Sequence, residues 1–247
     1  MDKKQVLETL KLVREYSKKR NFAQSVDLII NLKGLNLKKP EENIVSFIVL
    51  PKGRNKEAKV AALIGDELSS KAKEGFDLVI HKDKFREYGI DPKKTKKMAK
   101  KIDYFIAQAN LMPDVAKAFG KVLGPIGKMP NPKAGAVVPP TIPDLKVVIN
   151  KLKQTARLQT KNEQVVKTSA GAETMSDDDL AENILAIYTD VLHNVKDDKQ
   201  KIKEIIIKFS MGQAFIVGRK YNKEELVKEE KKQKKPAKKE KTKGAKK

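Results

Sequence analysis

The chain of 247 residues contains no cysteine and no tryptophan. Without cysteine it has no disulfide framework, no thiolate metal site and no cysteine nucleophile, and it suits a reducing compartment. No apolar run approaches the roughly 20 residues that span a bilayer. The charged start of the sequence, MDKKQVLETLKLVREY, is unlike a signal peptide. We therefore expect a cytoplasmic protein with no membrane partner.

The only two histidines, His81 and His193, lie far apart and show no metal-ligand spacing. We interpret both as surface or half-buried imidazoles and expect no metal and no cofactor. The acidic run Asp177–Asp179 follows Ser176, and capping with the helix dipole explains it without a magnesium ion. No Ser-His-Asp order or other catalytic constellation stands out. The sequence therefore predicts a protein that is not an enzyme.

Acidic residues are scarce relative to basic ones: 32 Asp and Glu face 54 Lys and Arg, a formal charge of +22. From Asn222 onward the chain has 12 Lys, 5 Glu and almost nothing apolar, which predicts a disordered basic tail over residues 222–247. The remaining 42 basic and 27 acidic residues still leave +15. Lysine-rich faces can serve solubility alone, which is the alternative explanation. An excess of this size favours binding of a polyanion, and nucleic acid is the foremost candidate.

Aromatic residues are also few, eight Phe and five Tyr. Stacking on single-stranded bases is therefore an unsuitable general mode of contact. Phosphates, 2′-hydroxyls and the shape of a folded RNA suit this composition better.

Hydrophobic periodicity divides the chain into three parts. The first part reads as a helix (Lys3–Lys19), a strand through Val26, Leu28 and Ile30, and a strand from Ile44 to Leu50. The last part reads as a hairpin (Thr155–Thr160 with Gln164–Thr168), a helix from Ser176 to about His193 with a capping box closed by Asp179, and two strands, Lys201–Ser210 and Ala214–Val217.

Between them, strands and helices alternate, as in parallel βαβ units. We expect strands at Lys59–Ile64, Phe76–Ile80 and Asp103–Ala107, and helices at Asp66–Lys73, Asp91–Lys101, Leu111–Val122 and Ile142–Leu152. The Gly/Pro-rich segment 123–140 is expected to be a loop, either rigid for its own sake or in backbone contact with RNA or protein.

The predicted fold class is therefore mixed, α/β and α+β, with two domains. Residues 1–57 and 153–221 would form a discontinuous α+β (split β-α-β) domain. Residues 58–152 would form an inserted, Rossmann-like α/β domain, joined through two linker strands that permit a hinge. A nucleotide site is not expected in the insert. Its first strand is followed by Gly65-Asp66-Glu67 instead of G-x-G-x-x-G, and Gly127-Lys128 precedes Met129 where a P-loop needs Ser or Thr.

Four segments resemble one known family. They are RNFAQSVDLIINL, LPKGRNKEAKVAALIGD, DYFIAQANLMPDVAKAFGKVLGPIGKMPNP and the strand ending KFSMG. Together they resemble the ribosomal protein L-one family, from about residue 3 to residue 218. The wording of GPIGKMPNP is similar to archaeal members.

The resemblance implies an RNA site in the terminal domain. Phe22 falls on the family's phenylalanine, Asp27 on its usual glutamate, and Ser210, Met211 and Gly212 on its Thr-Met-Gly turn. Asn21 stands where many bacterial members have Lys, and Arg20 beside it offers a replacement cation. Lys167 is a further candidate for a phosphate contact.

Ser210 and Asp27 would bond 2′-hydroxyls, which distinguish RNA from DNA. Gly212 would allow a close backbone approach to the RNA and a turn with φ > 0. The residues alone leave another interpretation open, in which Phe22 and Met211 are core residues at strand ends.

The family further implies a constituent of the large ribosomal subunit that holds a structured rRNA element as a mobile stalk near the tRNA exit site. It would assist release of deacylated tRNA, repress translation by binding its own mRNA, and be a monomer when free. The alternatives are a nucleotide-using enzyme built on the α/β block and a general DNA-coating protein suggested by charge alone.

Overall fold

The computed structural model describes residues 1–36, 39, 42–55, 57–69, 75–141, 144–160, 163–195 and 198–221. The predicted tail, residues 222–247, lies outside these residues. In chain order the elements are α1 (Lys3–Glu15), β1 (Ser25–Leu32), β2 (Val45–Val49), β3 (Val60–Ile64), α2 (Asp66–Ser69), β4 (Leu78–His81), α3 (Phe85–Ile90), α4 (Pro92–Lys101), β5 (Tyr104–Gln108), α5 (Met112–Ile126), β6 (Val137–Val138), α6 (Leu145–Gln154), β7 (Thr155–Gln159), β8 (Val165–Ala172), α7 (Asp177–Asn194), β9 (Ile202–Phe209) and β10 (Ala214–Ile216).

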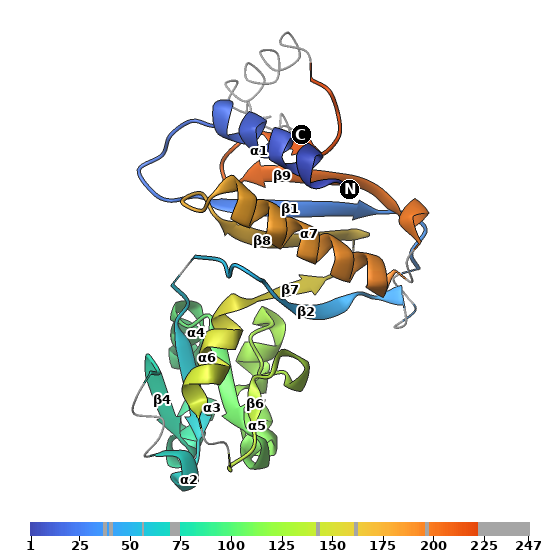
Figure 1. Ribbon diagram of the computed structural model, residues 1–247. Coiled ribbons are helices and arrows are strands. Elements are labelled where there is room, and N and C mark those ends of the chain that lie inside the picture. Colours follow the sequence, from blue (N-terminus) through green and yellow to red (C-terminus); the bar gives the residue numbers. More distant parts are fainter. Residues whose placement is uncertain are drawn as a thin grey trace, which may run out of the picture.

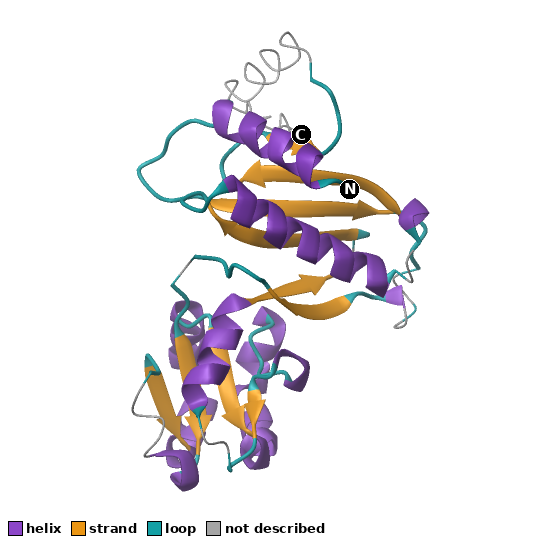
Figure 2. Cartoon of the chain, in the orientation of Figure 1, coloured by secondary structure: helices purple, strands orange, loops and turns teal. Residues whose placement is uncertain are grey.

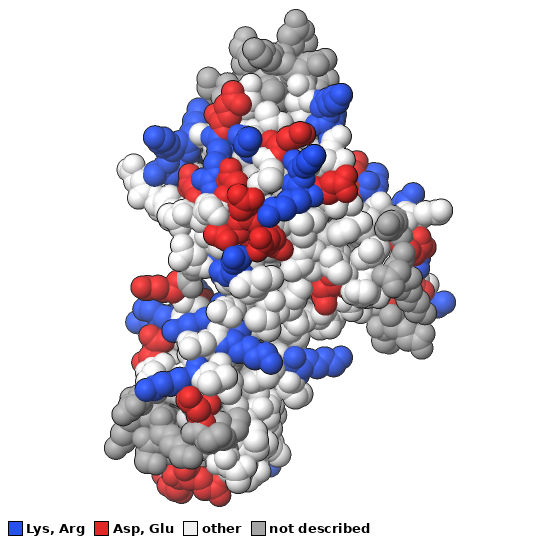
Figure 3. All heavy atoms as spheres, viewed as in Figure 1, with Lys and Arg blue, Asp and Glu red and all other residues white. Residues whose placement is uncertain are grey.

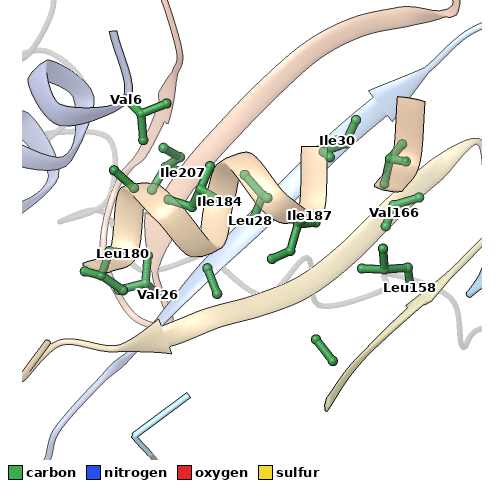
Figure 4. Packing of buried hydrophobic residues seen from close by; sticks show 14 of the residues in the cluster. Val6, Val26, Leu28, Ile30, Leu158, Val166, Leu180, Ile184, Ile187 and Ile207 are labelled. Carbon is green, nitrogen blue, oxygen red and sulfur yellow. The ribbon is translucent and has the colours of Figure 1, made fainter. Parts of the chain in front are cut away.

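Both ends of the chain meet in one antiparallel sheet of order β10-β9-β1-β8. Helices α1 and α7 lie on one face of it (Figures 1 and 2). The central strand β1 alternates half-buried and buried residues, with Val26, Leu28 and Ile30 inside. These three meet Ile184 and Ile187 of α7 in the core that Figure 4 shows. The period-two pattern of β1 therefore sets which face the helices cover.

The opposite face of this sheet carries the half-exposed residues of β1. The ladder register aligns them with their neighbours in three rows: Lys208–Asp27–Ser169, Ile206–Ile29–Lys167 and Glu204–Asn31–Val165. A polar row thus lies at one end of the face and an apolar centre next to it.

A second sheet is parallel throughout, in the order β4-β3-β5-β6. Helices α3, α4 and α5 bury one side of it through a cluster that includes Phe105 and Phe119, and α2 and α6 cover the other through Leu68 and Ile149. Because both faces are covered, every residue of β3 is buried. The chain thus combines an antiparallel and a parallel α/β arrangement; the domain boundaries at 58 and 152 stay a prediction.

Strands β2 and β7 form a separate antiparallel pair at the junction between the antiparallel and the parallel sheet (Figure 1). Two arginines tie this junction to the parallel sheet. The Arg54 guanidinium donates to the Tyr104 hydroxyl, which donates to the Thr155 carbonyl at 3.0 Å. Arg157 donates to the Gly127 carbonyl at 2.6 Å. Gly127 ends α5 in the left-handed region, with φ 78°, which favours glycine. A Cβ there would lie 2.6 Å from Arg157 Nη1 and would displace the guanidinium from the Gly127 carbonyl.

The predicted hairpin of residues 155–168 is wrong. β7 pairs with β2 and β8 pairs with β1, so the two segments enter different sheets. The alternation within each strand was detectable, but it does not say which strand is the partner. β8 also extends to Ala172, beyond the predicted Thr168.

The loop predicted for residues 123–140 is only partly a loop. Helix α5 continues through Pro125 to Ile126, and Val137–Val138 form β6 beside β5. Pro125 has no amide to donate to the carbonyl four residues before it, and the helix ends directly afterwards at Ile126, with Gly127 as the C-cap. Helix α1 ends at Glu15 instead of Lys19. The described part of the helix predicted at 66–73 is α2, and residues 70–73 lie outside the described residues.

The predicted N-cap of α7 is confirmed: Ser176 Oγ accepts from the Asp179 amide at 3.2 Å. The reciprocal contact differs from a capping box. Asp179 accepts the Ser176 hydroxyl at 2.7 Å instead of its backbone amide.

Candidate nucleic-acid interface

The start of β1 and the turn after β9 lie side by side at one end of the antiparallel sheet (Figure 1, left end of the upper sheet). The Ser210 amide donates to the Ser25 carbonyl at 3.0 Å. The two hydroxyls, Ser25 Oγ and Ser210 Oγ, share a hydrogen bond of 2.7 Å. Residues 185 positions apart in the sequence are thereby joined. We call the surface formed by residues 20–27 and 210–212 the sheet-end surface.

Two large apolar side chains are exposed on this surface. Phe22 is 55% and Met211 61% exposed. The interpretation of both as core residues is therefore wrong. Exposed apolar side chains beside hydroxyl and amide groups are typical of surfaces that bind a partner, because burying the apolar area on binding is favourable.

The Met211 turn is held from below by a buried glutamine. Gln24 is 1% exposed, and its Oε1 accepts from the Met211 amide at 3.3 Å. The backbone amide of Gln24 donates to Glu173 Oε2 at 3.1 Å, and the backbone carbonyl of Gln24 accepts from the Glu173 backbone amide at 2.8 Å. Arg14 of α1 completes the support, donating to the Glu173 carbonyl at 3.0 Å and to Asp177 Oδ1 at 2.6 Å. Sequence reasoning missed this network because no periodicity or motif links its members.

Gly212 has a steric role in the turn but lacks the positive φ expected for it. Positive φ values occur at six glycines of the described chain, and Gly212 is not one of them. The predicted φ > 0 turn is therefore wrong. A Cβ at Gly212 would lie 3.1 Å from Phe209 Cβ and 3.4 Å from Ser17 Oγ, so glycine allows the turn to close against β9 and the end of α1.

Asp27 lies on the open face, in the row between Lys208 and Ser169. Burial raises the pKa of its carboxyl above 3.8, and the Ser25 hydroxyl, the Lys208 charge and the Ser210 hydroxyl oppose the rise. The carboxylate is thus surrounded by donors and can accept a further one, such as a ribose hydroxyl. Ser25 lies on the same face of β1 as Asp27, which the alternation of that strand could have indicated. Ser169 and Lys208 join the site through the pairing of β1 with β8 and β9, which no local pattern shows.

Substituting Asp27→Asn is expected to leave the protein at least as stable as the wild type at pH 7. A raised pKa means that the folded state favours the protonated acid. Stability from this group is greatest below pH 3.8 and is lost as the pH rises through the folded pKa. Denaturant titrations between pH 3 and 7 measure this. The gain in stability of Asp27→Asn over the wild type should become smaller as the pH is lowered.

Asp179→Asn is the matched control of opposite sign. Its Ser176 hydrogen bond, followed by Lys52, lowers the Asp179 pKa. Its stabilisation is therefore present at neutral pH and lost as the pH falls below 3.8. If Asp27→Asn were less stable than the wild type at pH 7 and Asp179→Asn were not, the assignment of these environments would be wrong.

The other candidates are less closely grouped. Arg20 and Asn21 are exposed in the segment between α1 and β1. Lys167 is exposed in the next row of the sheet, opposite Ile29, and its Nζ pairs with Glu163 at 2.7 Å. Arg20 and Asn21 thus lie at the edge of the sheet-end surface, whereas Lys167 lies on the open face beyond it.

Within the described residues no cluster of His, Cys, Asp and Glu could hold a metal ion. No helix of the described part is both long and apolar enough to cross a membrane.

Comparison with known proteins completes the description. The model of the Ribosomal protein L1p/L10e family matches residues 13–213. A protein of Pyrococcus abyssi, named large ribosomal subunit protein uL1, is 39% identical over 217 residues, 87% of this chain and 96% of the relative. Proteins of the same name from Methanothermococcus thermolithotrophicus (41%, over 86% and 97%) and Methanothermobacter thermautotrophicus (40%, over 84% and 96%) are similarly close. The chain therefore belongs to the ribosomal protein L1p/L10e family, with archaeal members among its relatives.

Proposed function

We propose that this chain is a non-enzymatic constituent of the large ribosomal subunit that binds a structured 23S-type rRNA element through the sheet-end surface. The names of the relatives support the ribosomal role. The observation that carries the location is the meeting of β1 with the 210–212 turn, where exposed Phe22 and Met211 stand on a backbone braced by Gln24. Preorganised donors and apolar contacts of this kind suit a folded RNA.

The finer role follows as part of the same proposal. The bound element would form the mobile stalk near the tRNA exit site in the cytoplasmic ribosome, where it assists release of deacylated tRNA. The free protein, a monomer, would also bind its own mRNA and repress translation. Residues 58–152 would act as a unit that swings on the junction formed by β2 and β7. The Arg54–Tyr104 and Arg157–Gly127 contacts would hold one position of that junction.

The rival function, a nucleotide-using enzyme, finds little support at the turn after β3. There the Gly65 amide, which would face a phosphate, donates to Gln108 Oε1 at 3.1 Å. Gln108 in turn donates to Glu67 Oε2 at 2.6 Å. A buried amide and a carboxylate thus occupy the position of an anion, and the carboxylate would repel a pyrophosphate.

The proposal predicts a preference for RNA that depends on one hydroxyl. Ser210→Val removes a group that can bond a ribose hydroxyl, and about 1–1.5 kcal/mol, roughly tenfold in affinity, should be lost. Fluorescence anisotropy with a folded rRNA stalk fragment, its DNA analogue and ATP measures this across salt. Ser46→Val, in strand β2, is the control for the substitution itself.

Equal affinity for RNA and DNA, unchanged in Ser210→Val, would refute the sheet-end surface and leave a charge-driven nucleic-acid coat. Saturable ATP binding would favour the enzyme. Tighter binding of RNA than DNA, reduced by Ser210→Val but not by Ser46→Val, supports the proposal.

A further inference from the structure

The positive charge of the parallel-sheet part is concentrated in one helix. Residues 58–152 contain 18 Lys and Arg and 10 Asp and Glu. Helix α4 (Pro92–Lys101) alone holds six of the 18 and no acidic residue, which leaves 12 against 10 elsewhere in the segment. The net charge outside α4 is therefore close to neutral. This helix does not belong to the sheet-end surface.

The six lysines occupy one side of α4. Its other side, with Thr95 and Ala99 buried and Met98 half-buried, packs into the cluster beneath α3 and α5. At about 100° per residue, Lys93, Lys96, Lys97 and Lys100 fall within roughly 100° of one another around the axis. All four are exposed. Figure 3 shows the Lys and Arg side chains on one face of the molecule.

Nearby acidic groups leave most of this charge unpaired. Glu87 pairs with Lys94, and Asp91 accepts the amides of Lys93 and Lys94 as the N-cap. Among the described residues, the ion pairs include none of the remaining five lysines of α4. Like charges three and four residues apart repel and destabilise a helix. Lysines in the first turn also oppose the helix dipole. The folded protein thus retains repulsion among the α4 lysines, which a bound polyanion would reduce.

A groove beside the helix is also lined by lysines. It has a volume of about 470 Å³ and is lined by Lys94, Lys97 and Lys101 of α4, by Lys59 and by the ring of Tyr88. The Tyr88 ring is covered by Lys94 Nζ at 5.2 Å, so it is not a free stacking platform for a base. Asp77, also in the lining, accepts the Val60 amide at 2.8 Å. The groove therefore suits a backbone phosphate better than a base.

We propose that the lysine face of α4 binds the phosphate backbone of an RNA duplex segment, separate from the element held at the sheet-end surface. This inference extends the proposed function and needs RNA as the partner of the chain. Helix α4 is about 15 Å long. B-form DNA has about 3.4 Å of axis per phosphate along one strand, and the A-form helix of RNA has less, so α4 spans at least roughly four phosphates of an RNA strand. The contact reads no sequence, because it reaches phosphates and not base edges.

A triple substitution in the full chain tests the surface. Lys93→Gln, Lys97→Gln and Lys100→Gln together remove three charges and keep the side-chain stems. The matched control removes three charges from α6, also a ten-residue helix but on the other face of the sheet: Lys146→Gln, Lys151→Gln and Lys153→Gln. The probe is the folded rRNA stalk fragment extended by a 20-base-pair RNA duplex, titrated between 0.05 and 0.5 M KCl. Thermal melts check that both variants fold.

Each lost phosphate contact lowers the slope of log affinity against log salt by about 0.9, and so costs about eightfold at 0.1 M salt. We expect the α4 variant to lose two to three units of slope, and therefore at least about a hundredfold in affinity at 0.1 M salt. The α6 variant should stay within about twofold of the wild type. Equal losses in both variants, or no loss in the α4 variant, would overturn the proposal.

Ser210→Val separates this inference from the proposed function. If that variant binds the extended RNA like the wild type while the α4 variant binds it weakly, the sheet-end surface fails and the α4 surface stands. If Ser210→Val weakens binding and the α4 variant does not, the reverse holds.

Discussion

Replacing Asn183 by alanine is expected to lower the free energy of unfolding by about 3–5 kcal/mol. Asn183 lies in α7 with 0% exposure. Its Nδ2 donates to the Gly53 carbonyl at 2.7 Å and to the Ala170 carbonyl at 2.9 Å, and its Oδ1 accepts from the Lys52 amide at 3.1 Å. Alanine leaves three backbone groups without a partner, two of them in buried contacts. Urea titration followed by circular dichroism measures the loss.

Asn194→Ala is the matched control within the same helix. That side chain is exposed and bonds only the last turn of α7, through Asp190, so its loss should cost less than about 0.5 kcal/mol. Asn183→Asp, which keeps the acceptor but loses both donors, should fall near Asn183→Ala. Equal and small effects at positions 183 and 194 would contradict the assignment.

The contacts of Asn183 bear on the expected hinge. Two linker strands were expected to permit a hinge, and Pro51-Lys52-Gly53 lies on the connection from β2 to β3. In the structure this segment is bound to α7 and to the turn before it. Besides the Asn183 contacts, Lys52 Nζ lies 3.4 Å from Asp179 of α7, and Asn55 donates to Thr174 of the preceding turn at 3.1 Å. A hinge motion would therefore bend the chain after Asn55, nearer to β3, and not at the Pro-Gly turn.

Sequence reasoning found the elements better than their partners. Alternation in β1 and the 3.6-residue period of α1 and α7 are local signals, and they survive in the structure. Which strand lies beside which depends on non-local contacts, so β7 was paired with β8 when its ladder is with β2. Short elements such as β6, two residues long, are fixed by the sheet beside them and leave almost no local pattern.

The candidate site shows the same division. Phe22, Asp27 and the 210–212 turn came from resemblance to a family, and the structure brings them to one end of one sheet. The residues that hold these candidates in place could not be found from the sequence. Gln24 lies between two candidates in the chain, yet only the folded backbone shows its amide oxygen beneath Met211. The positive φ expected at Gly212 is wrong. The short distance to Phe209 explains the glycine instead, and the sequence alone does not distinguish these two reasons.

Removing both exposed apolar side chains, with Phe22→Ala and Met211→Ala together, should weaken binding of the folded rRNA stalk fragment about a hundredfold. Truncating central apolar anchors of an interface typically costs 1–3 kcal/mol each, and about 3 kcal/mol together gives this factor. Because the side chains are 55% and 61% exposed, the fold should lose little stability. Calorimetric titration measures the affinity, and thermal melts measure the stability.

The matched control is Ile90→Ala with Val147→Ala, two side chains that are 82% and 63% exposed in the parallel-sheet part. This pair removes apolar area from the surface at positions remote from the 210–212 turn, so it should leave RNA affinity within about twofold. The salt slope distinguishes the mechanism: Phe22 and Met211 carry no charge, so their loss should lower affinity equally at every salt concentration, whereas loss of the α4 lysines lowers the slope itself. A hundredfold loss in the control pair, or a changed slope in the Phe22–Met211 pair, would contradict recognition by apolar contact at the sheet-end surface.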